Sequence, residues 1–198
     1  VIKQIADQGT AVIIVEQSVN LALTIADRAY FMEKGQIRFA GSTKELLNRP
    51  DLLRSVFLSN TLISAVETSS KPSSKETKAI LEIEDMTRSF GGILAVNSVT
   101  FDVRSNEIIG IMGPNGAGKT TLFDLLSGFV PSQGGSIKLL GQDITTKSPA
   151  ERSKLGLGRS FQDARLFPSL TVAEAIAVAL ERFTSCLLYT SDAADERL

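Results

Sequence analysis

Apolar and polar positions alternate in short blocks over residues 1–58 and predict a compact region of strands and helices. Residues 10–16, TAVIIVE, form a β-branched run of the length of a buried strand. Residues 18–28 carry apolar side chains at helical spacing, which predicts an amphipathic helix. The apolar side of this helix comprises Val19, Ala22, Leu23 and Ala26.

A hairpin and a further short helix are expected in the remainder of this first region. Residues 29–33 and 36–40 have the pattern of two strands, and Lys34-Gly35 between them suits a tight turn. Ser42 followed by Glu45 has the spacing of a capping box, in which each residue hydrogen-bonds the backbone of the other. That spacing predicts a helix that begins directly after Ser42.

Composition changes sharply over residues 59–78. This stretch contains six serines, three threonines, a proline and scattered charges. Such a segment cannot bury enough apolar surface to offset the entropy lost when the chain becomes ordered. We therefore expect a linker here.

Strands and helices alternate again over residues 79–183, which predicts an α/β fold. Strand patterns occupy 80–86, 98–103, 107–112 and 134–141. A helical pattern covers 120–127 and is expected to end at Gly128. Two further helices are expected to begin at capping-box spacings, one at Ser148 with Glu151 and the other at Thr171 with Glu174. The helix that begins after Ser148 is expected to end at Gly156.

Charge and composition narrow the classes of function. The net charge of −1, from 21 basic and 22 acidic residues, provides no electrostatic basis for nucleic-acid binding. Histidine is absent, which removes histidine-dependent catalysis and histidine metal sites from these residues.

No apolar run approaches the ~18 residues of a membrane span, so any membrane association is expected to come through a partner. The single cysteine, Cys186, cannot form an internal disulfide, and a reduced, cytoplasmic setting fits.

The last fifteen residues, 184–198, do not continue the preceding pattern. Residues 186–196, CLLYTSDAADE, are the conceptual translation of a transposase mosaic-end adapter used in sequencing libraries. We therefore expect the gene-derived sequence to end near Ser185 and the tail to be read-through. The alternative is a genuine C-terminal tail that has this string by chance.

A phosphate-binding loop is predicted where the buried strand 107–112 meets the helix 120–127. The octapeptide GPNGAGKT fits the pattern G-x-x-x-x-G-K-[ST], which arises by chance in roughly one chain in a hundred of this length. Glycines let successive N–H groups turn toward phosphate oxygens, Lys119 supplies charge to the β- and γ-phosphates, and the Thr120 hydroxyl ligates Mg²⁺. The alternative is a glycine-rich structural turn. The expected nucleotide-binding residues are Gly113, Pro114, Asn115, Gly116, Ala117, Gly118, Lys119, Thr120 and Thr121.

The surroundings of this loop resemble the ATP-binding cassette (ABC) ATPases. The run GPNGAGKTTL, with SFGGILAVNSVTFDV before it and GLGRSFQDARLFPSLTVAEAI after it, is similar to the cassettes of branched-chain amino-acid importers. The resemblance covers residues 79–183 almost continuously. It implies a P-loop NTPase fold, here an incomplete ABC nucleotide-binding domain, with ATP and Mg²⁺ as cofactors.

The resemblance also assigns roles to individual residues outside the loop. Phe90 matches the aromatic residue that stacks on adenine, and Val96 the residue that packs against the edge of the ring. Gln162 matches the glutamine that touches Mg²⁺ and the attacking water, and with Lys119 it forms the implied catalytic set. Phe90 could instead be a core residue at a strand end, and Gln162 a solvated loop residue. Asp163 to Pro168 would lie where the coupling helix of a permease docks, unless they pack within the cassette itself.

The first region resembles the opposite end of the same family, the segment that closes a cassette. Most cassettes carry a switch histidine directly after that strand, where this chain has Gln17 after Glu16. Glutamine can donate a hydrogen bond to a phosphate but cannot carry charge, so functional and structural interpretations of Gln17 stay open. Residues 1–58 are thus expected to end a first cassette and 79–183 to begin a second. Residues 1–58 could also dock beside the second cassette.

This order implies an internal slice of a tandem two-cassette protein, a transport ATPase at the cytoplasmic face of the cell membrane. Its implied partners are permease subunits, the other cassette of the same chain and, indirectly, a solute-binding protein. The chain contains no LSGGQ-like string and no run of four apolar residues followed by Asp-Glu. We therefore expect the chain alone to bind nucleotide without turnover.

Two other classes of protein are alternatives to the importer. The first is a tandem-cassette translation factor that acts on ribosomes, whose linker is usually helical and rich in charge, whereas the Ser/Thr linker here has no arginine. The second is a P-loop GTPase, which would require an N-K-x-D guanine motif that this chain lacks.

Overall fold

The computed structural model describes residues 1–48, 78–160 and 169–180, and all structural statements below refer to these residues. The chain divides into two compact units, residues 1–155 and 156–198. Each unit is described on its own. The predicted linker, most of which lies within 49–77, and the predicted tail, 184–198, fall outside the described residues.

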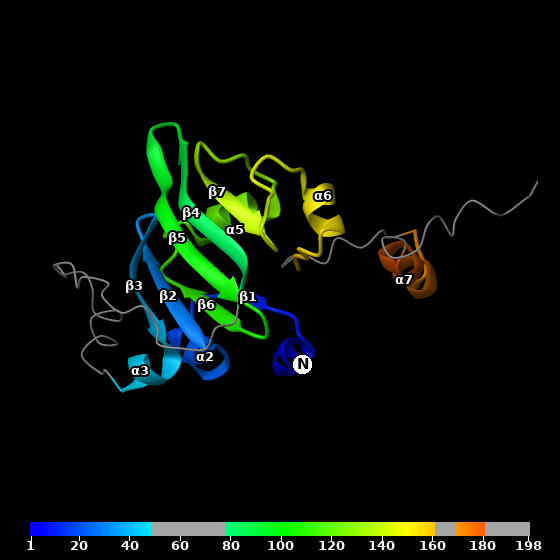
Figure 1. Ribbon diagram of the computed structural model, residues 1–198, viewed down its shortest axis with the longest axis horizontal. Helices are drawn as coiled ribbons and strands as arrows, with labels where there is room; N and C mark the ends of the chain where they lie inside the picture. Colours follow the sequence, from blue (N-terminus) through cyan, green and yellow to red (C-terminus); the bar gives the residue numbers. More distant parts are fainter. Residues whose placement is uncertain (49–77, 161–168, 181–198) are drawn as a thin grey trace, which may run out of the picture. The chain divides into compact units, whose positions relative to one another are not determined.

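The centre of the first unit is a four-stranded sheet with the order β1-β6-β2-β3. Strand β6 runs parallel to both of its neighbours, and β2 and β3 form an antiparallel hairpin. Figure 1 shows the consequence: the green strand β6 lies between blue strands from the beginning of the chain. Residues 1–48 and 79–155 therefore build one sheet together. The strands are β1 (Val12–Glu16), β2 (Arg28–Glu33), β3 (Gln36–Ser42) and β6 (Ile108–Met112).

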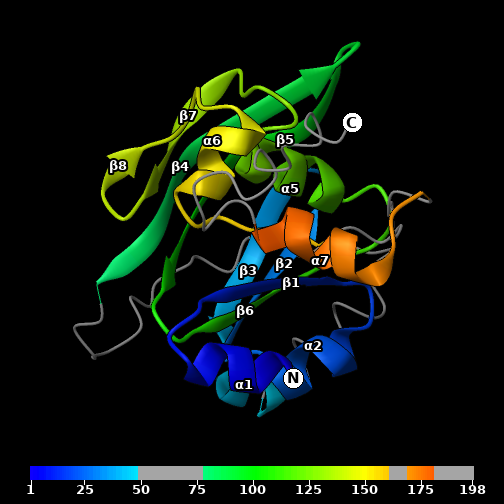
Figure 2. The same cartoon turned by 90° about the vertical axis from the view of Figure 1, so that its right-hand side faces the viewer.

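Strand β6 is buried along its whole length because both faces of the sheet are covered. Helix α2 packs closely on one face, where a Cβ atom at Gly110 would lie 3.3 Å from the Cβ of Ala26. Figure 2 shows α1 and α2 on this face, and α5 with a second sheet on the other. The helices of the first face are α1 (Ile2–Asp7), α2 (Val19–Ile25) and α3 (Thr43–Leu47). The helix of the opposite face is α5 (Lys119–Ser127).

The second sheet is antiparallel and has the order β5-β4-β7-β8. Its long hairpin extends well beyond the predicted strands 80–86 and 98–103, because the residues near the Gly91-Gly92 turn are paired as well. Both of these glycines have positive φ, which lets the chain reverse tightly. The strands are β4 (Ala79–Phe90), β5 (Ile93–Arg104), β7 (Gly134–Leu139) and β8 (Gln142–Asp143).

The predicted helix over 18–28 is shorter than its pattern suggests. The four residues of its expected apolar side are all buried, but α2 ends at Ile25. Asp27 leaves the helix because its backbone N–H donates to the carbonyl of Ile108 at 2.7 Å, and its carboxylate accepts from the N–H of Ile108 at 2.9 Å. Pairing with β6 therefore overrides the helical periodicity.

The predicted helix caps are present. The Ser42 hydroxyl accepts from the Glu45 N–H at the start of α3, and both halves of the capping box between Ser148 and Glu151 form at α6 (Pro149–Lys154). In the second unit, Thr171 caps α7 (Val172–Leu180), and the Glu174 carboxylate accepts from the Thr171 N–H at 2.7 Å. None of the helices in the described part of the chain combines the length and the apolar character needed to cross a membrane.

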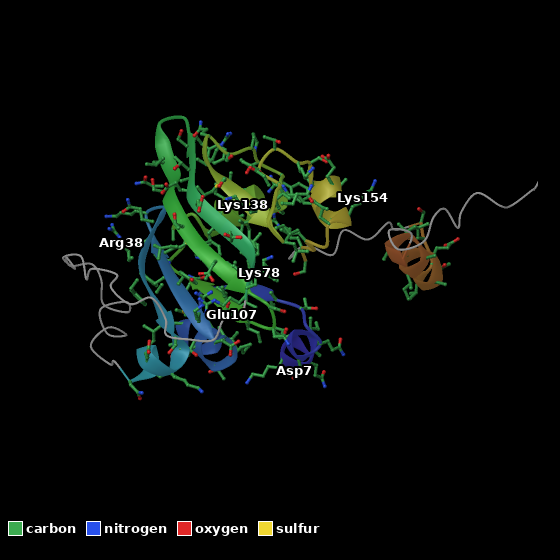
Figure 3. All side chains as sticks on the ribbon, viewed as in Figure 1. Asp7, Arg38, Lys78, Glu107, Lys138 and Lys154 are labelled. Atoms are coloured by element: carbon green, nitrogen blue, oxygen red, sulfur yellow. The ribbon has the colours of Figure 1, made fainter. Side chains whose placement is uncertain are left out.

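Arg28 ties residues 1–48 to the remainder of the first unit. Its guanidinium donates to the Glu107 carboxylate at 2.9 Å and to the backbone carbonyl of Asp102 at 2.7 Å. Glu107, labelled in Figure 3, also accepts from the N–H of Arg104. Bidentate contacts of this kind fix both distance and orientation, so they hold β2 in register beside β6.

Candidate nucleotide-binding site

The predicted strand–loop–helix unit is formed. Residues 113–118 connect the buried strand β6 to α5, and Gly118 is the residue that caps the helix at its amino end. The helix ends at Gly128, whose φ of 81° stops it in the left-handed conformation, as predicted. The first turn of α5 therefore directs its unpaired N–H groups toward the loop.

The loop itself has one exposed side and one buried side. Pro114, Asn115 and Gly116 are exposed, and a Cβ atom at Gly116 would meet nothing within 4 Å. On the other side, Ala117 is 2% exposed and its N–H donates back to the carbonyl of Pro114. Exposed loop backbone on one side and a buried residue on the other fit the binding of a chain of phosphates.

The Lys119 side chain folds back onto the start of the loop. Its ammonium donates to the carbonyl oxygens of Gly113 at 2.6 Å and Pro114 at 2.9 Å. Burial lowers the pKa of Lys119 from its ordinary value. Two loop carbonyls thus hold the ammonium at the loop, and its third N–H remains available for an anion. Thr120 is exposed at the start of α5 and Thr121 is half-buried.

Phe90 is placed as an exposed aromatic rather than as a core residue. It ends β4 opposite Ile93 and is 44% exposed. The guanidinium carbon of Arg88 lies 4.7 Å from the centre of the Phe90 ring, so the cation covers one of its faces. Arg88 also donates to the carbonyl of Pro131, whereas its buried Nε has no hydrogen-bond partner among the described residues.

Val96 lies in the core beside the residue of β5 that contacts the loop. Its side chain is fully buried, at 0% exposure, so it offers no surface to a ring in this conformation. The neighbouring Ala95 is half-buried, and a Cβ atom at Gly118 would lie 2.1 Å from its carbonyl oxygen. Strand β5 therefore touches the loop through the backbone of Ala95, and a role for Val96 stays a prediction.

The residues that the sequence predicts near the γ-phosphate are described only in part. Gln17 is exposed directly after β1, and Glu16 pairs in register with Met112, the residue before the loop. The carboxyl ends of neighbouring parallel strands meet at one edge of a sheet, so Gln17 and the loop begin at the same level. Gln162 and the segment from Asp163 to Pro168 lie outside the described residues.

One important residue, Arg152, was not predicted from the sequence. Although charged, it is 2% exposed, and burial lowers its pKa. Its guanidinium donates to the carbonyls of Leu125 and Leu126 at 2.6 and 2.7 Å, and also to those of Thr145 and Lys147. Arg152 thereby holds the carboxyl end of the loop's helix. Its position in a polar helix gives no sign of this in the sequence.

Together, the sheet with a central parallel strand, the glycine loop and the lysine define a P-loop nucleotide-binding protein. The family described as "ABC transporter" matches residues 96–197, which are 102 of the 198 residues. The chain belongs to the ABC transporter family.

Two curated relatives illustrate the similarity. The high-affinity branched-chain amino acid transport ATP-binding protein BraF of Pseudomonas aeruginosa is 42% identical over 106 residues, which are 54% of this chain and 42% of BraF. The protein of the same description, LivG, of Escherichia coli K12 is 40% identical over 103 residues, which are 52% of this chain and 40% of LivG. The chain thus spans about two fifths of the length of these relatives.

Solved structures of ATP-binding cassettes are also similar. One structure of MJ1267, an ATP-binding cassette of an ABC transporter, is 36% identical and has a TM-score of 0.43, over 45% of this chain and 35% of that one. Its ADP conformation is 28% identical and has a TM-score of 0.44, over 52% and 46% of the two chains.

Proposed function

We propose that this chain is part of the ATP-binding, ATP-hydrolysing subunit of an ABC importer for branched-chain amino acids or related solutes. The observation that carries the proposal is the Lys119 ammonium, held over an open glycine loop at the start of α5. The names of BraF and LivG support the solute class and favour an importer over a ribosomal factor.

Each residue of the site would act through charge and position, because phosphoryl transfer depends mainly on both. Lys119 would bind the β- and γ-phosphates, the loop N–H groups would bind phosphate oxygens, and Thr120 would ligate Mg²⁺. When bound, Mg²⁺ would neutralise developing charge on the phosphates. Gln162 would orient the attacking water, and Phe90 would stack on the adenine.

In this chain alone, binding without turnover is the proposed outcome. The sequence has neither a signature-like LSGGQ string nor a run of four apolar residues followed by Asp-Glu. In the tandem protein that we propose, these groups come from the remaining parts of both cassettes. That protein would lie at the cytoplasmic face of the membrane on permease subunits that contact residues 163–168, and an external binding protein would deliver the solute.

Replacing Lys119 with alanine should lower ATP affinity at least about tenfold. The change removes the ammonium that two loop carbonyls hold, and a charge-assisted hydrogen bond is worth roughly 1.5–3 kcal/mol. Titration of the full chain with ATP carrying a fluorescent ribose label, in the presence of Mg²⁺, measures this loss. Phosphate release should be equally low in both proteins, since both lack the other catalytic groups.

Lys138, half-buried on β7, provides the control for this test (Figure 3). Lys138→Ala removes the same charge and should leave ATP affinity unchanged. Equal affinities of the Lys119→Ala variant and the wild-type chain would contradict the proposed site. Mg²⁺-dependent turnover that disappears in Lys119→Ala would instead contradict binding without turnover.

Replacing Arg88 with methionine should weaken binding of ATP about two- to fivefold without affecting binding of inorganic tripolyphosphate. Methionine keeps an unbranched side chain but removes the cation that holds one face of the Phe90 ring, an interaction worth roughly 0.5–1 kcal/mol at an exposed site. Competition of both ligands against the labelled nucleotide separates the base from the phosphates. Arg38→Met, which removes a partly exposed arginine of β3, is the matched control. An equal loss for both ligands would contradict a role of the Arg88–Phe90 pair in binding the base.

A further inference from the structure

Residues 1–48 contact the phosphate-binding loop directly, although the loop begins more than sixty residues later in the chain. The Gly35 N–H donates to the carbonyl oxygen of Ala117 at 2.9 Å, and the Asn97 N–H donates to the carbonyl of Gly35 at 2.8 Å. Gly35 therefore bridges the loop and β5 through its backbone. Without it, the carbonyl of the buried Ala117 would lose this partner.

The turn that presents Gly35 is well defined. Lys34 and Gly35 have φ of 49° and 81°, so both central residues of the β2–β3 hairpin adopt the left-handed conformation typical of a tight two-residue turn. A Cβ atom at Gly35 would lie 2.9 Å from the carbonyl oxygen of Ala95 and 3.0 Å from that of Leu94. The turn thus fits closely against β5, which also touches Gly118 of the loop.

Strand β2, which leads into this turn, also contacts the beginning of the loop. A Cβ atom at Gly113 would lie 2.2 Å from the carbonyl oxygen of Met32 in β2. Phe31 pairs in register with Met112, and Arg28 fixes the other end of β2 through Glu107. Residues 28–35 therefore constrain the loop at Gly113 and at Ala117, on both sides of the exposed residues.

We infer that the β2–β3 hairpin is a positioning element of the nucleotide site, so that ATP binding and the docking of residues 1–48 onto 79–155 are energetically coupled. This inference rests on the proposed nucleotide binding. Two segments from opposite sides of the linker then form one composite site within this chain. Because such coupling is reciprocal, a hairpin that docks well raises ATP affinity, and bound ATP stabilises the docked hairpin.

Two glycine substitutions in residues 1–48 test the inference. Gly35→Ala should reduce ATP affinity of the full chain at least about fivefold, the lower end of typical coupling. Gly9→Ala is the matched control, because Gly9 also has positive φ, at 101°, but a Cβ atom there meets nothing within 4 Å. Gly9→Ala should bind ATP as the wild-type chain does. Equal affinities of the two variants would overturn the coupling.

If the Gly35→Ala variant does not fold, hydrogen exchange of the wild-type chain tests the coupling instead. Addition of ATP should slow exchange of the backbone N–H groups in β2 and at Gly35 as well as in the loop. Protection confined to the loop would overturn the coupling while leaving the proposed function intact. Absence of protection in both places, with no binding of labelled ATP, would contradict the proposed function itself.

Discussion

Replacing Gly118 with alanine should destabilise the first unit by roughly 3 kcal/mol more than replacing Gly116 with alanine. Both glycines belong to the loop and both have left-handed φ, 99° and 79°, so both variants share a similar backbone strain. They differ in their surroundings: a Cβ atom at Gly118 would lie 2.1 Å from the carbonyl oxygen of Ala95, whereas at Gly116 it would meet nothing. Overpacking against backbone forces β5 to shift, which typically costs ~1–3 kcal/mol and occasionally more.

Urea unfolding of the full chain without nucleotide measures this difference, since no ligand then contributes to stability. The midpoint of Gly118→Ala should fall well below that of Gly116→Ala. Equal midpoints would show that β5 does not press against the loop at Ala95. ATP affinity of Gly116→Ala adds a second readout, because its new methyl group would lie at the open side of the loop.

Replacing Arg152 with methionine should lower the free energy of unfolding by about 3 kcal/mol. The change leaves the carbonyls of Leu126 and Thr145 without their charged donor in a buried place, and each unsatisfied group costs ~1–3 kcal/mol before the structure relaxes. The carbonyl of Leu125 keeps the N–H of Gly128 as a donor. Arg152→Lys should recover only part of the loss, because an ammonium cannot reproduce the planar fork that reaches all of these carbonyls.

Lys154 provides the control for Arg152 on the same helix. It is exposed on α6, where Figure 3 labels it, and Lys154→Met removes the same charge without breaking buried contacts. Lys154→Met should change stability by less than ~0.5 kcal/mol. If Arg152→Met were as stable as Lys154→Met, the guanidinium would not support the carboxyl end of α5.

Elements with a strong local pattern were predicted well. The buried run of β6, the glycine loop, the helix ending at Gly128 and the capping boxes at Ser148 and Thr171 are all present, because each depends on neighbouring residues. The β4–β5 hairpin is longer than predicted, since residues 87–90 and 93–97 owe their strand conformation to cross-strand pairing rather than to an alternating pattern.

Contacts distant in sequence could not be predicted in the same way. The burial of Arg152 and the hydrogen bond from Gly35 to Ala117 depend on which segments meet in space. The spacing of apolar residues along the chain does not contain this information. The sequence allows residues 1–58 to dock beside the second region, but it does not predict that β6 lies between β1 and β2. Assignment of the two segments to different cassettes stays a prediction.

The position of β6 between β1 and β2 has a consequence for synthesis on the ribosome. The β2–β3 hairpin can form as soon as it emerges, but β1 and β2 do not pair with each other, and both need β6. At roughly 5–20 residues per second, the roughly 60 residues between α3 and β6 take about 3–12 s to translate. During that interval the edges of β1 and β2 that pair with β6 in this structure do not yet have that partner, so a chaperone that binds nascent strands should associate with residues 12–33 until Met112 has emerged.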